Sequence, residues 1–457
     1  MNILIILTGI GLVAMLSEIF RVRKVVYPVT IAGLIATIAA VCMNWGTHQR
    51  FFSDMMFLDN YALGFTAVMV GTTLIWFLLN AGYMRDHEHE TDYTALIIFA
   101  LAGATVMVSY ADLTMLFIGL EILSISMYVM SAANKNELRS NEAGLKYFLL
   151  GAFATGFLLF GIALIYGVTG TFNIQELTAF VSANRLALPP MFFAGVLLMM
   201  VGLTFKVSAA PFHFWAPDVY EGAPTPVTGF MSTVVKTAAF AAFLRLFSTS
   251  FISISDWWTP VLAIFSAISM IGGNLLAVYQ KSLKRMLAYS SISHAGYMLM
   301  ALVAANQTSS GALLLYVAAY SVGSLGIFSI LLSLTNSGNE SVSALKGFAS
   351  IHKFPAFMIT VIMLSLAGIP PVAGFFAKYY LFVATLQTGY TWLVLVAILS
   401  SLVGVYYYFR VIIAMFQPSD RETTQIQLST TQQVALVLAF ILSIVIGLFP
   451  GFITGSI

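Results

Sequence analysis

Charged residues are scarce in this sequence. Asp, Glu, Lys and Arg make up 8% of its 457 residues, and 60% of the residues are hydrophobic. Soluble globular domains carry about 25% charged residues. A soluble globular protein is therefore excluded, and the composition indicates a polytopic membrane protein. We expect its surroundings to be the lipid bilayer, with no nucleic acid among its partners.

Cysteine and nucleotide-binding motifs are also nearly absent. The single cysteine, Cys42, cannot by itself hold an iron–sulfur cluster, a structural zinc ion or a disulfide. No GxGxxG or P-loop pattern follows a strand. The run DHEHETD, residues 86–92, suggests either a metal site or a solvated charge cluster, and an exposed loop favours the cluster. We therefore expect no metal and no cofactor on this chain.

Long apolar runs dominate the rest of the sequence. Runs of about 20 residues predict membrane-spanning helices. The candidate runs, about fourteen in number, are residues 2–20, 26–45, 61–83, 93–109, 113–133, 143–166, 190–220, 226–247, 258–279, 286–305, 311–335, 354–386, 391–416 and 433–453. The first run has basic residues only after it, unlike a cleavable signal peptide, so we expect it to be retained. The predicted fold class is an all-α polytopic membrane protein.

The distribution of basic residues predicts the orientation of these spans, because cytoplasmic loops are enriched in Lys and Arg. Only two loop residues, Arg50 and Arg185, follow even-numbered spans. Twelve follow odd-numbered spans: Arg21, Arg23, Lys24, Arg85, Lys135, Arg139, Lys281, Lys284, Arg285, Lys346, Lys353 and Arg421. The odd loops are therefore predicted to be cytoplasmic and both termini to lie on the outer side.

Six basic residues lie inside the predicted spans: Lys146, Lys206, Lys236, Arg245, Lys378 and Arg410. Arg245 and Arg410 are near span ends, where a long side chain is expected to reach the interface. Lys146 lies near a helix start and is also expected to face the cytoplasm. The other three lysines lie at membrane depth, where charge is costly and functional by default.

The seventh predicted span contains a helix-breaking proline. Pro211 removes a backbone donor and clashes with the preceding turn, so the helix is predicted to break near residues 209–211. Broken backbone in a membrane must be buried in protein or line a wet cavity. Lys206 before the break and His213 after it therefore suggest an ion pathway. The alternative is a proline kink with a snorkelling lysine.

A second break is predicted in the twelfth span. There, Gly368, Pro370, Pro371 and Gly374 interrupt an apolar run that continues to Lys378. Two interrupted spans in corresponding positions indicate inverted repeats around a transport site. The breaks are five spans apart, and an odd offset inverts one repeat relative to the other. We therefore predict three peripheral N-terminal helices in residues 1–92, one repeat in 93–247, a second in 258–416, and a C-terminal helix in 433–453.

Six titratable residues are predicted to form a series near one depth: Glu121, Lys206, His213, Lys236, His294 and Lys378. An isolated carboxylate in a membrane is expected to need a cationic partner, and Lys206 is the candidate partner of Glu121. A lysine whose partner can move away becomes a releasable proton carrier. Two alternatives stay open: Glu121 and Lys206 as a structural ion pair, and the histidines as hydrogen-bonded core residues.

Three segments of the chain resemble one protein family. They are FKVSAAPFHFWAPDVYEGAPTPVT, NLLAVYQKSLKRMLAYSSISHAGY and LAGIPPVAGFFAKYY. They resemble the antiporter-like subunit N of bacterial proton-translocating NADH:quinone oxidoreductase, respiratory complex I, called subunit 2 in mitochondria. The resemblance covers nearly the whole chain. It implies fourteen helices with two inverted five-helix repeats, of which the seventh and twelfth helices are discontinuous.

The resemblance also implies roles for the titratable residues. Glu121 and Lys206 would form the input pair, Lys236 the central relay and Lys378 the outlet, while the two histidines match polar positions on a hydrated axis. NADH, FMN, iron–sulfur clusters and quinone would lie on or between other subunits. Another antiporter-like subunit and small membrane subunits would be its neighbours, in the cell inner membrane with both termini periplasmic.

Two rival functions stay open. A subunit of a multi-subunit sodium/proton antiporter shares the glutamate and the broken-helix lysine, but sodium sites need acidic or carbonyl oxygens, and this chain is rich in buried lysine instead. A ferredoxin-dependent photosynthetic homologue is also similar. A purely structural scaffold would not need six titratable groups at depth.

Overall fold

The computed structural model of the chain describes residues 1–85, 89–336, 338–418 and 428–457. Part of the DHEHETD run, residues 86–88, lies outside the described residues, and so does Arg421, one of the predicted cytoplasmic basic residues.

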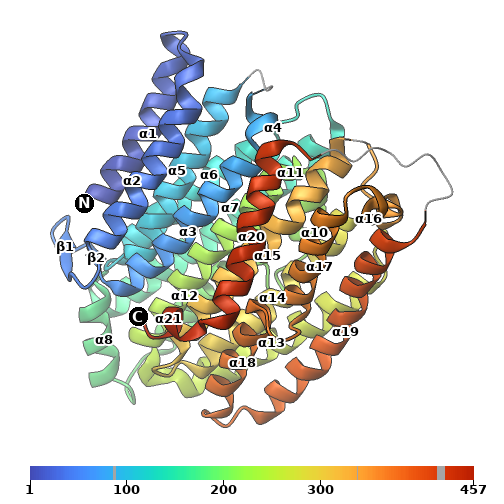
Figure 1. Cartoon of the computed structure of the whole chain (residues 1–457). Helices are drawn as coiled ribbons and strands as arrows, with labels where there is room; N and C mark the ends of the chain where they lie inside the picture. The colour runs from blue at the N-terminus through green and yellow to red at the C-terminus, as the bar shows by residue number, and fades with distance from the viewer. Residues whose placement is uncertain (86–88, 337, 419–427) are drawn as a thin grey trace.

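The described chain is a bundle of helices that confirms the predicted all-α membrane class (Figure 1). Twelve helical segments of the described residues are long and apolar enough to cross a membrane. Eleven of them contain α1 (Asn2–Ile19), α2 (Val26–Met43), α3 (Asn60–Leu79), α5 (Glu90–Ser109), α6 (Leu113–Ser131), α7 (Leu138–Thr169), α13 (Ser255–Val278), α14 (Leu283–Ala304), α15 (Ser309–Asn336), α19 (Thr391–Phe416) and α20 (Thr430–Leu448).

The twelfth segment, Thr225–Thr249, is a composite helix. It consists of α11 (Thr225–Phe230), a π-helical turn (Met231–Val235) and α12 (Lys236–Thr249). A π turn contains one more residue than an α-helical turn, and such turns are frequent at functional sites. Nothing in the apolar run around Lys236 predicts this turn, and Lys236 is the first residue after it.

Two predicted spans, residues 190–220 and 354–386, are each divided into two shorter helices. The first consists of α9 (Pro190–Lys206) and α10 (Trp215–Gly222), and the second of α17 (Lys353–Ala367) and α18 (Ala373–Leu386). Each interruption contains the proline predicted to cause it, Pro211 or the Pro370–Pro371 pair. The described residues therefore contain twelve continuous helical segments long enough to cross a membrane, whereas the apolar runs predicted about fourteen spans.

The remaining elements are short. They are α4 (Ala81–Arg85), α8 (Ile174–Ala183), α16 (Phe348–Ile351), α21 (Pro450–Thr454), the 3₁₀ turns Arg23–Val25, Ile252–Ile254 and Val342–Leu345, and the strands β1 (Gln49–Phe51) and β2 (Met56–Leu58). The two strands pair antiparallel in a small hairpin.

The centre of the bundle is formed by α15 and the composite helix, whose apolar windows are buried throughout. In contrast, α1 and α2 are mostly exposed and lie at one edge of the molecule, and α19 lies at another (Figure 1). Helix α3 is mostly buried and packs against α2, α15 and α20. Charged side chains on the composite helix are therefore buried inside the protein.

The expectation that Arg245 reaches the interface is wrong, because this side chain is buried and has its partners inside the protein. Arg410 is half-buried and lines a groove at the surface, so its expected place stands. Arg245 is buried, and its Nη2 lies 2.6 Å from Oδ1 of Asp59, the N-cap of α3. Its guanidinium also lies 4.6 Å from the centre of the Tyr61 ring. Arg410 donates to two backbone carbonyls at the end of α13. Hydropathy cannot distinguish such internal partners from interfacial water.

Candidate functional site

Three of the predicted site residues are fully buried lysines on three different helices. The exposed fractions of Lys206, Lys236 and Lys378 are 4%, 1% and 7%. Within the described part of the chain, none of them forms an ion pair. Their ammonium groups bind hydroxyls and backbone carbonyls instead. Such a lysine can lose its proton without leaving a buried carboxylate uncompensated.

Lys206 is the last residue of α9, and its cation lies where the helix dipole favours positive charge. Its Nζ donates to Ser124 Oγ at 2.7 Å and to the Tyr147 hydroxyl at 3.4 Å. The rings of Tyr128 and Tyr147 have their centres 5.9 and 5.5 Å from the same nitrogen. The aromatic faces add cation–π stabilisation, so the charged form of Lys206 is held without a carboxylate.

Glu121, the predicted partner of Lys206, does not form the expected ion pair. It lies on α6 one turn before Ser124, on the same side of that helix. Its Oε1 is buried and has no hydrogen-bond partner among the described residues. Lys206 donates to Ser124 and Tyr147 instead. The alternative of a purely structural ion pair between these two side chains does not fit this geometry.

Lys236 lies immediately after the π turn and points toward α14. Its Nζ donates to the Ser291 carbonyl oxygen at 2.7 Å and also to the Ser291 hydroxyl. The centre of the Tyr320 ring lies 5.9 Å away. Serine on α14 and tyrosine on α15 therefore form the surroundings of the central lysine.

His294 on α14 packs against the Tyr320 ring. Its Nδ1 is 2.8 Å from the Tyr316 hydroxyl, and its Nε2 is 3.1 Å from the Tyr408 hydroxyl. Tyr408 in turn shares a hydrogen bond with Ser290. The His294 and Tyr320 rings have centres 4.8 Å apart, so one tyrosine ring contacts His294 and also lies near Lys236. Both nitrogens of His294 are hydrogen-bonded, which also fits the alternative of a satisfied core histidine.

Lys378 lies on α18, after the second break. Its Nζ donates to the carbonyl of Ala367, the last residue of α17, at 2.9 Å, and to Ser401 Oγ at 2.8 Å. The Tyr297 ring centre is 5.0 Å away. Gly368 has a positive φ of 86°, and a Cβ there would lie 2.9 Å from the Lys378 nitrogen. The break therefore requires glycine both for its backbone and for room beside the lysine.

The structure does not bring His213 into this series. It lies in the first break, half buried, and its Nδ1 has no hydrogen-bond partner among the described residues. Lys146 also lies apart, as expected, with 39% of its side chain exposed. Its Nζ lies 2.7 Å from Glu142 and 2.9 Å from Asp218.

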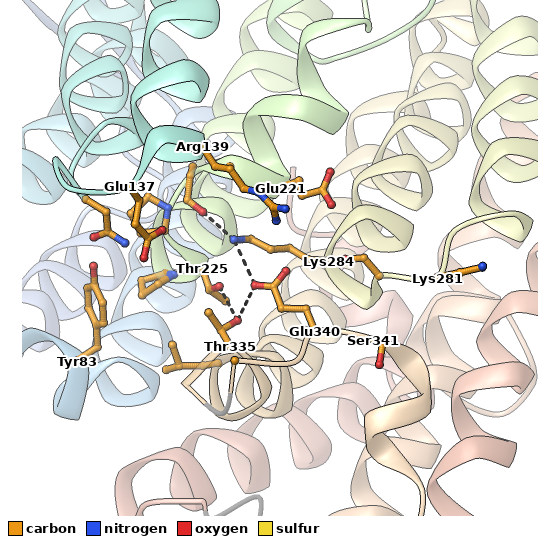
Figure 2. A pocket seen from close by; sticks show the side chains of 18 residues that line it. Tyr83, Glu137, Arg139, Glu221, Thr225, Lys281, Lys284, Thr335, Glu340 and Ser341 are labelled. Atoms are coloured by element: carbon orange, nitrogen blue, oxygen red, sulfur yellow. Dashed lines mark hydrogen bonds and ion pairs between the residues drawn. The ribbon is translucent and has the colours of Figure 1, made fainter. Parts of the chain in front are cut away.

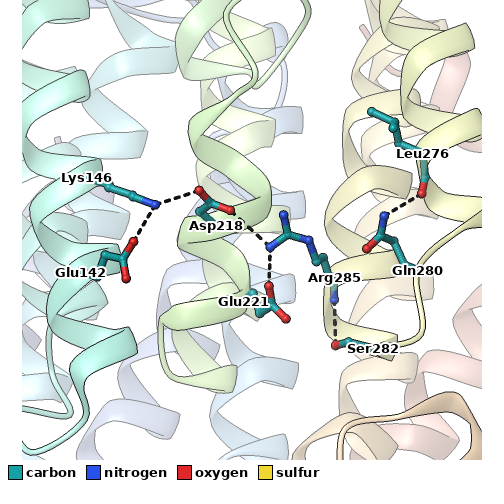
Figure 3. A network of polar contacts seen from close by, with 8 residues as sticks. All are labelled: Glu142, Lys146, Asp218, Glu221, Leu276, Gln280, Ser282 and Arg285. Carbon is teal, nitrogen blue, oxygen red and sulfur yellow. Dashed lines mark hydrogen bonds and ion pairs between the residues drawn. The ribbon is translucent and has the colours of Figure 1, made fainter.

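The ion pair of Lys146 belongs to a surface network shown in Figure 3. Asp218 on α10 lies 3.2 Å from Arg285 on α14, which also pairs with Glu221 on α10. Exposed pairs contribute little individually, about 0–1 kcal/mol. The network nevertheless connects α7, α10 and α14, and so holds the short helix after the first break against its neighbours.

A polar cavity of about 530 Å³ lies beside this network, and Lys284 lies at its centre (Figure 2). Although the sequence analysis assigned Lys284 to a loop, it is a buried residue of α14 with 4% exposure. Its Nζ donates to the Ala223 carbonyl at 2.7 Å and lies 3.8 Å from Glu340. Thr335 donates to the same glutamate at 2.9 Å.

A second, much smaller cavity leads inward from Lys284. Its volume of about 10 Å³ is close to that of one water molecule, and Lys284, Ser290 and Tyr320 are among its lining residues. Ser290 binds Tyr408, which binds His294, so polar groups continue from the large cavity to the buried histidine.

Sequence reasoning missed most of the polar groups that contact the lysines. The hydroxyls of Ser124, Tyr147 and Ser401 do not stand out among apolar residues, because serine and tyrosine are common in membrane helices. Lys284 was missed because it stands next to Arg285 in a basic cluster, which the positive-inside rule assigns to a loop. Its place two residues after the N-cap Ser282 was the available signal.

No group of three or more His, Cys, Asp or Glu side chains in the described ranges could hold a metal ion. The site consists of ammonium, imidazole, carboxylate and hydroxyl groups. Its chemistry is therefore acid–base chemistry: these groups can accept, hold and release protons.

Known proteins match this chain over nearly its whole length. Residues 111–404 match the family described as NADH:quinone oxidoreductase/Mrp antiporter, TM. The NADH-quinone oxidoreductase subunit N of Cytophaga hutchinsonii is 40% identical over 453 residues, which cover 98% of each chain.

Solved structures also match the chain over nearly its whole length. A chain of respiratory complex I from Thermus thermophilus with bound aureothin is 33% identical and has a TM-score of 0.84, covering 99% of this chain and 98% of that one. A chain of the membrane-bound sulfane sulfur reductase, an archaeal respiratory membrane complex, has a TM-score of 0.87 at 24% identity, covering 100% and 96%. The second likeness concerns the fold alone.

Proposed function

This chain belongs to the family of NADH-quinone oxidoreductase subunit N, and from this premise we propose that it is a proton-translocating subunit in the membrane arm of NADH:quinone oxidoreductase, respiratory complex I. The observation that carries the proposal is the set of three buried lysines without ion-pair partners among the described residues. Electron transfer from NADH to quinone would occur on other subunits, which would hold FMN and the iron–sulfur clusters.

The complete span count in this proposal is fourteen. Two discontinuous spans, α9 with α10 and α17 with α18, add to the twelve continuous ones. Residues 93–247 and 258–416 form the two inverted repeats, residues 1–92 precede them, and the helix in 433–453 follows. The two breaks occupy equivalent places in the repeats, and each has a buried lysine beside it, Lys206 or Lys378.

The proposed proton path begins at the cavity around Lys284. From there, the single-water cavity leads to the Ser290 and Tyr320 region, where Lys236 and His294 lie. Tyr297 lies near both His294, with ring centres 6.0 Å apart, and Lys378. Lys378 at the second break is the outlet. Glu121 and Lys206 act on the path electrostatically as its input pair, and His213 is assigned to it by family resemblance alone.

In the proposed orientation, both termini face the periplasm and the Lys284 cavity faces the cytoplasm. We expect single cysteines introduced near Phe452 to react with an impermeant maleimide from the outside of intact cells, and cysteines at Ser341 to react only from the inside. Because the native Cys42 is exposed, the experiment requires a Cys42→Ser background. Labelling of both positions from one side would contradict the fourteen-span count.

The second candidate is a subunit of a multi-subunit sodium/proton antiporter, because the matched family includes Mrp antiporters. The buried lysines disfavour it, since sodium sites need oxygen ligands from carboxylates and carbonyls. A ferredoxin-dependent photosynthetic homologue is the third candidate. The three differ in what assembles with the chain: another antiporter-like subunit and small membrane subunits are expected in each, but NADH-oxidising subunits only in complex I.

Co-purification tests the proposal. A tagged chain extracted in mild detergent is expected to bring with it flavin, iron–sulfur clusters and NADH:quinone activity. An assembly with neither flavin nor iron–sulfur clusters would favour the antiporter, and clusters without NADH oxidation would favour the ferredoxin-dependent homologue.

A further inference from the structure

A groove of about 560 Å³ at the end of α13 and α19 collects positive charge. Its cationic lining residues are Lys281, Lys346 and Arg410, and the described residues that line it include no Asp or Glu. The groove is separate from the polar cavity around Lys284, although Lys281 and Ser341 border both. The proposed proton path does not use it.

The two lysines of the groove are available to a ligand. Lys281 and Lys346 are exposed, and neither forms an ion pair within the described ranges. Figure 2 shows the Lys281 nitrogen on the side away from Glu340 and Lys284. Arg410 donates to the Val278 and Gln280 carbonyls at 2.8 and 2.6 Å, which fixes its guanidinium at the groove.

Hydroxyl groups complete the polar side of the groove. The Ser341 and Ser343 oxygens are 2.9 Å apart, and Ser341 also donates to Asn339 at 2.7 Å. These hydroxyl protons are used within the loop, so the lysine ammonium groups are the donors available to phosphate oxygens, and ionised acceptors form the stronger hydrogen bonds.

An apolar stripe on the outer face of α19 leads directly to the groove. Five side chains at helical spacing are more than half exposed: Leu395, Leu399, Leu402, Tyr406 and Ile413. The last two also line the groove. Such a stripe is an expected lipid-facing surface, and tyrosine favours the headgroup level of a membrane. The cationic groove therefore lies where acyl chains along α19 would reach their headgroup.

We propose that this groove binds the phosphate of an anionic lipid, whose acyl chains lie along the outer stripe of α19. The continuous apolar surface favours a lipid over free phosphate. The absence of a carboxylate among the described lining residues disfavours zwitterionic headgroups, because nothing would pair with their ammonium. Basic pockets between membrane helices recognise anionic headgroups in this way.

The test uses the full chain within its purified, delipidated complex and measures retained lipid by native mass spectrometry. The probes are phosphatidylglycerol, phosphatidylcholine of the same chain length, and inorganic phosphate. The double variant Lys281→Gln/Lys346→Gln is expected to bind phosphatidylglycerol about 30-fold more weakly than the parent, since each lysine near a headgroup contributes about fivefold. The matched control, Lys24→Gln/Lys135→Gln, removes the same charge at exposed lysines elsewhere.

The proposal is supported if only the groove variant loses phosphatidylglycerol binding and the parent binds little phosphatidylcholine. Equal losses in both double variants would show general attraction to a basic surface and overturn it. If phosphatidylcholine were retained as well as phosphatidylglycerol, the groove would bind acyl chains without recognising the headgroup. If inorganic phosphate bound in a lysine-dependent way and phosphatidylglycerol did not bind, the groove would be an ion site. Both of these results also overturn the proposal.

Discussion

Replacing Lys378 with alanine is expected to lower NADH-driven proton translocation by about a hundredfold, which is the low end of what a positioned proton-transfer group contributes. Replacing it with arginine is expected to impair translocation too. Arginine keeps the positive charge, but it does not lose its proton in proteins. Acidification by membrane vesicles, normalised to the amount of assembled complex, measures both variants.

The contacts of Lys378 explain why both variants are needed. Its Nζ binds the last carbonyl of α17 and Ser401, so it stabilises the end of a broken helix as well as offering a proton. A purely structural lysine would tolerate arginine, whose guanidinium can bind the same carbonyl. The matched control is Lys146→Ala, because Lys146 is partly exposed and lies in a surface ion pair. It is expected to leave translocation close to the parent value.

Replacing Glu121 with glutamine is expected to slow pumping-linked turnover by about threefold to tenfold, an electrostatic coupling of roughly 1 kcal/mol. The carboxylate favours the protonated form of nearby Lys206, and its removal disturbs that balance. Alanine is expected to act like glutamine, and aspartate to be milder, since it keeps the charge. NADH-driven proton uptake and quinone reduction, measured together, report the effect.

Ser124 offers a second test of the same coupling. It lies one turn from Glu121 and accepts the hydrogen bond of Lys206, so Ser124→Ala combined with Glu121→Gln is expected to be non-additive. Glu142→Gln is the matched control, because Glu142 is 59% exposed on the neighbouring helix α7. Turnover near the parent value in both Glu121→Gln and Glu121→Ala would reduce Glu121 to a residue without a role in proton transfer.

The features that the sequence predicted well are those with few physical alternatives. Proline cannot continue a helix, so the interruptions around Pro211 and Pro370 could be predicted from the residues alone. Lys206, Lys236 and Lys378 have apolar neighbours on both sides, and their burial followed from that. The length of the apolar runs predicted the membrane helices in the same way.

The features that the sequence did not predict depend on helix rotation and on packing between distant segments. Glu121 and Lys206 were expected to touch, but nothing in either helix shows that Ser124 and Tyr147 would take the lysine's hydrogen bonds. Arg245 was expected at the interface and is paired with Asp59, 186 positions away in the chain. Lys284 looked like a loop residue because basic neighbours surround it in sequence, whereas α14 buries it.

The ratio of protons translocated to NADH oxidised tests the central claim most directly, that the buried lysines work by giving up protons. It is measured in sealed vesicles that contain the fully assembled complex with Lys378→Arg, beside the parent. We expect a clearly lower ratio for the variant, because arginine holds its proton. A ratio equal to that of the parent would show that positive charge alone suffices at Lys378 and would contradict the account.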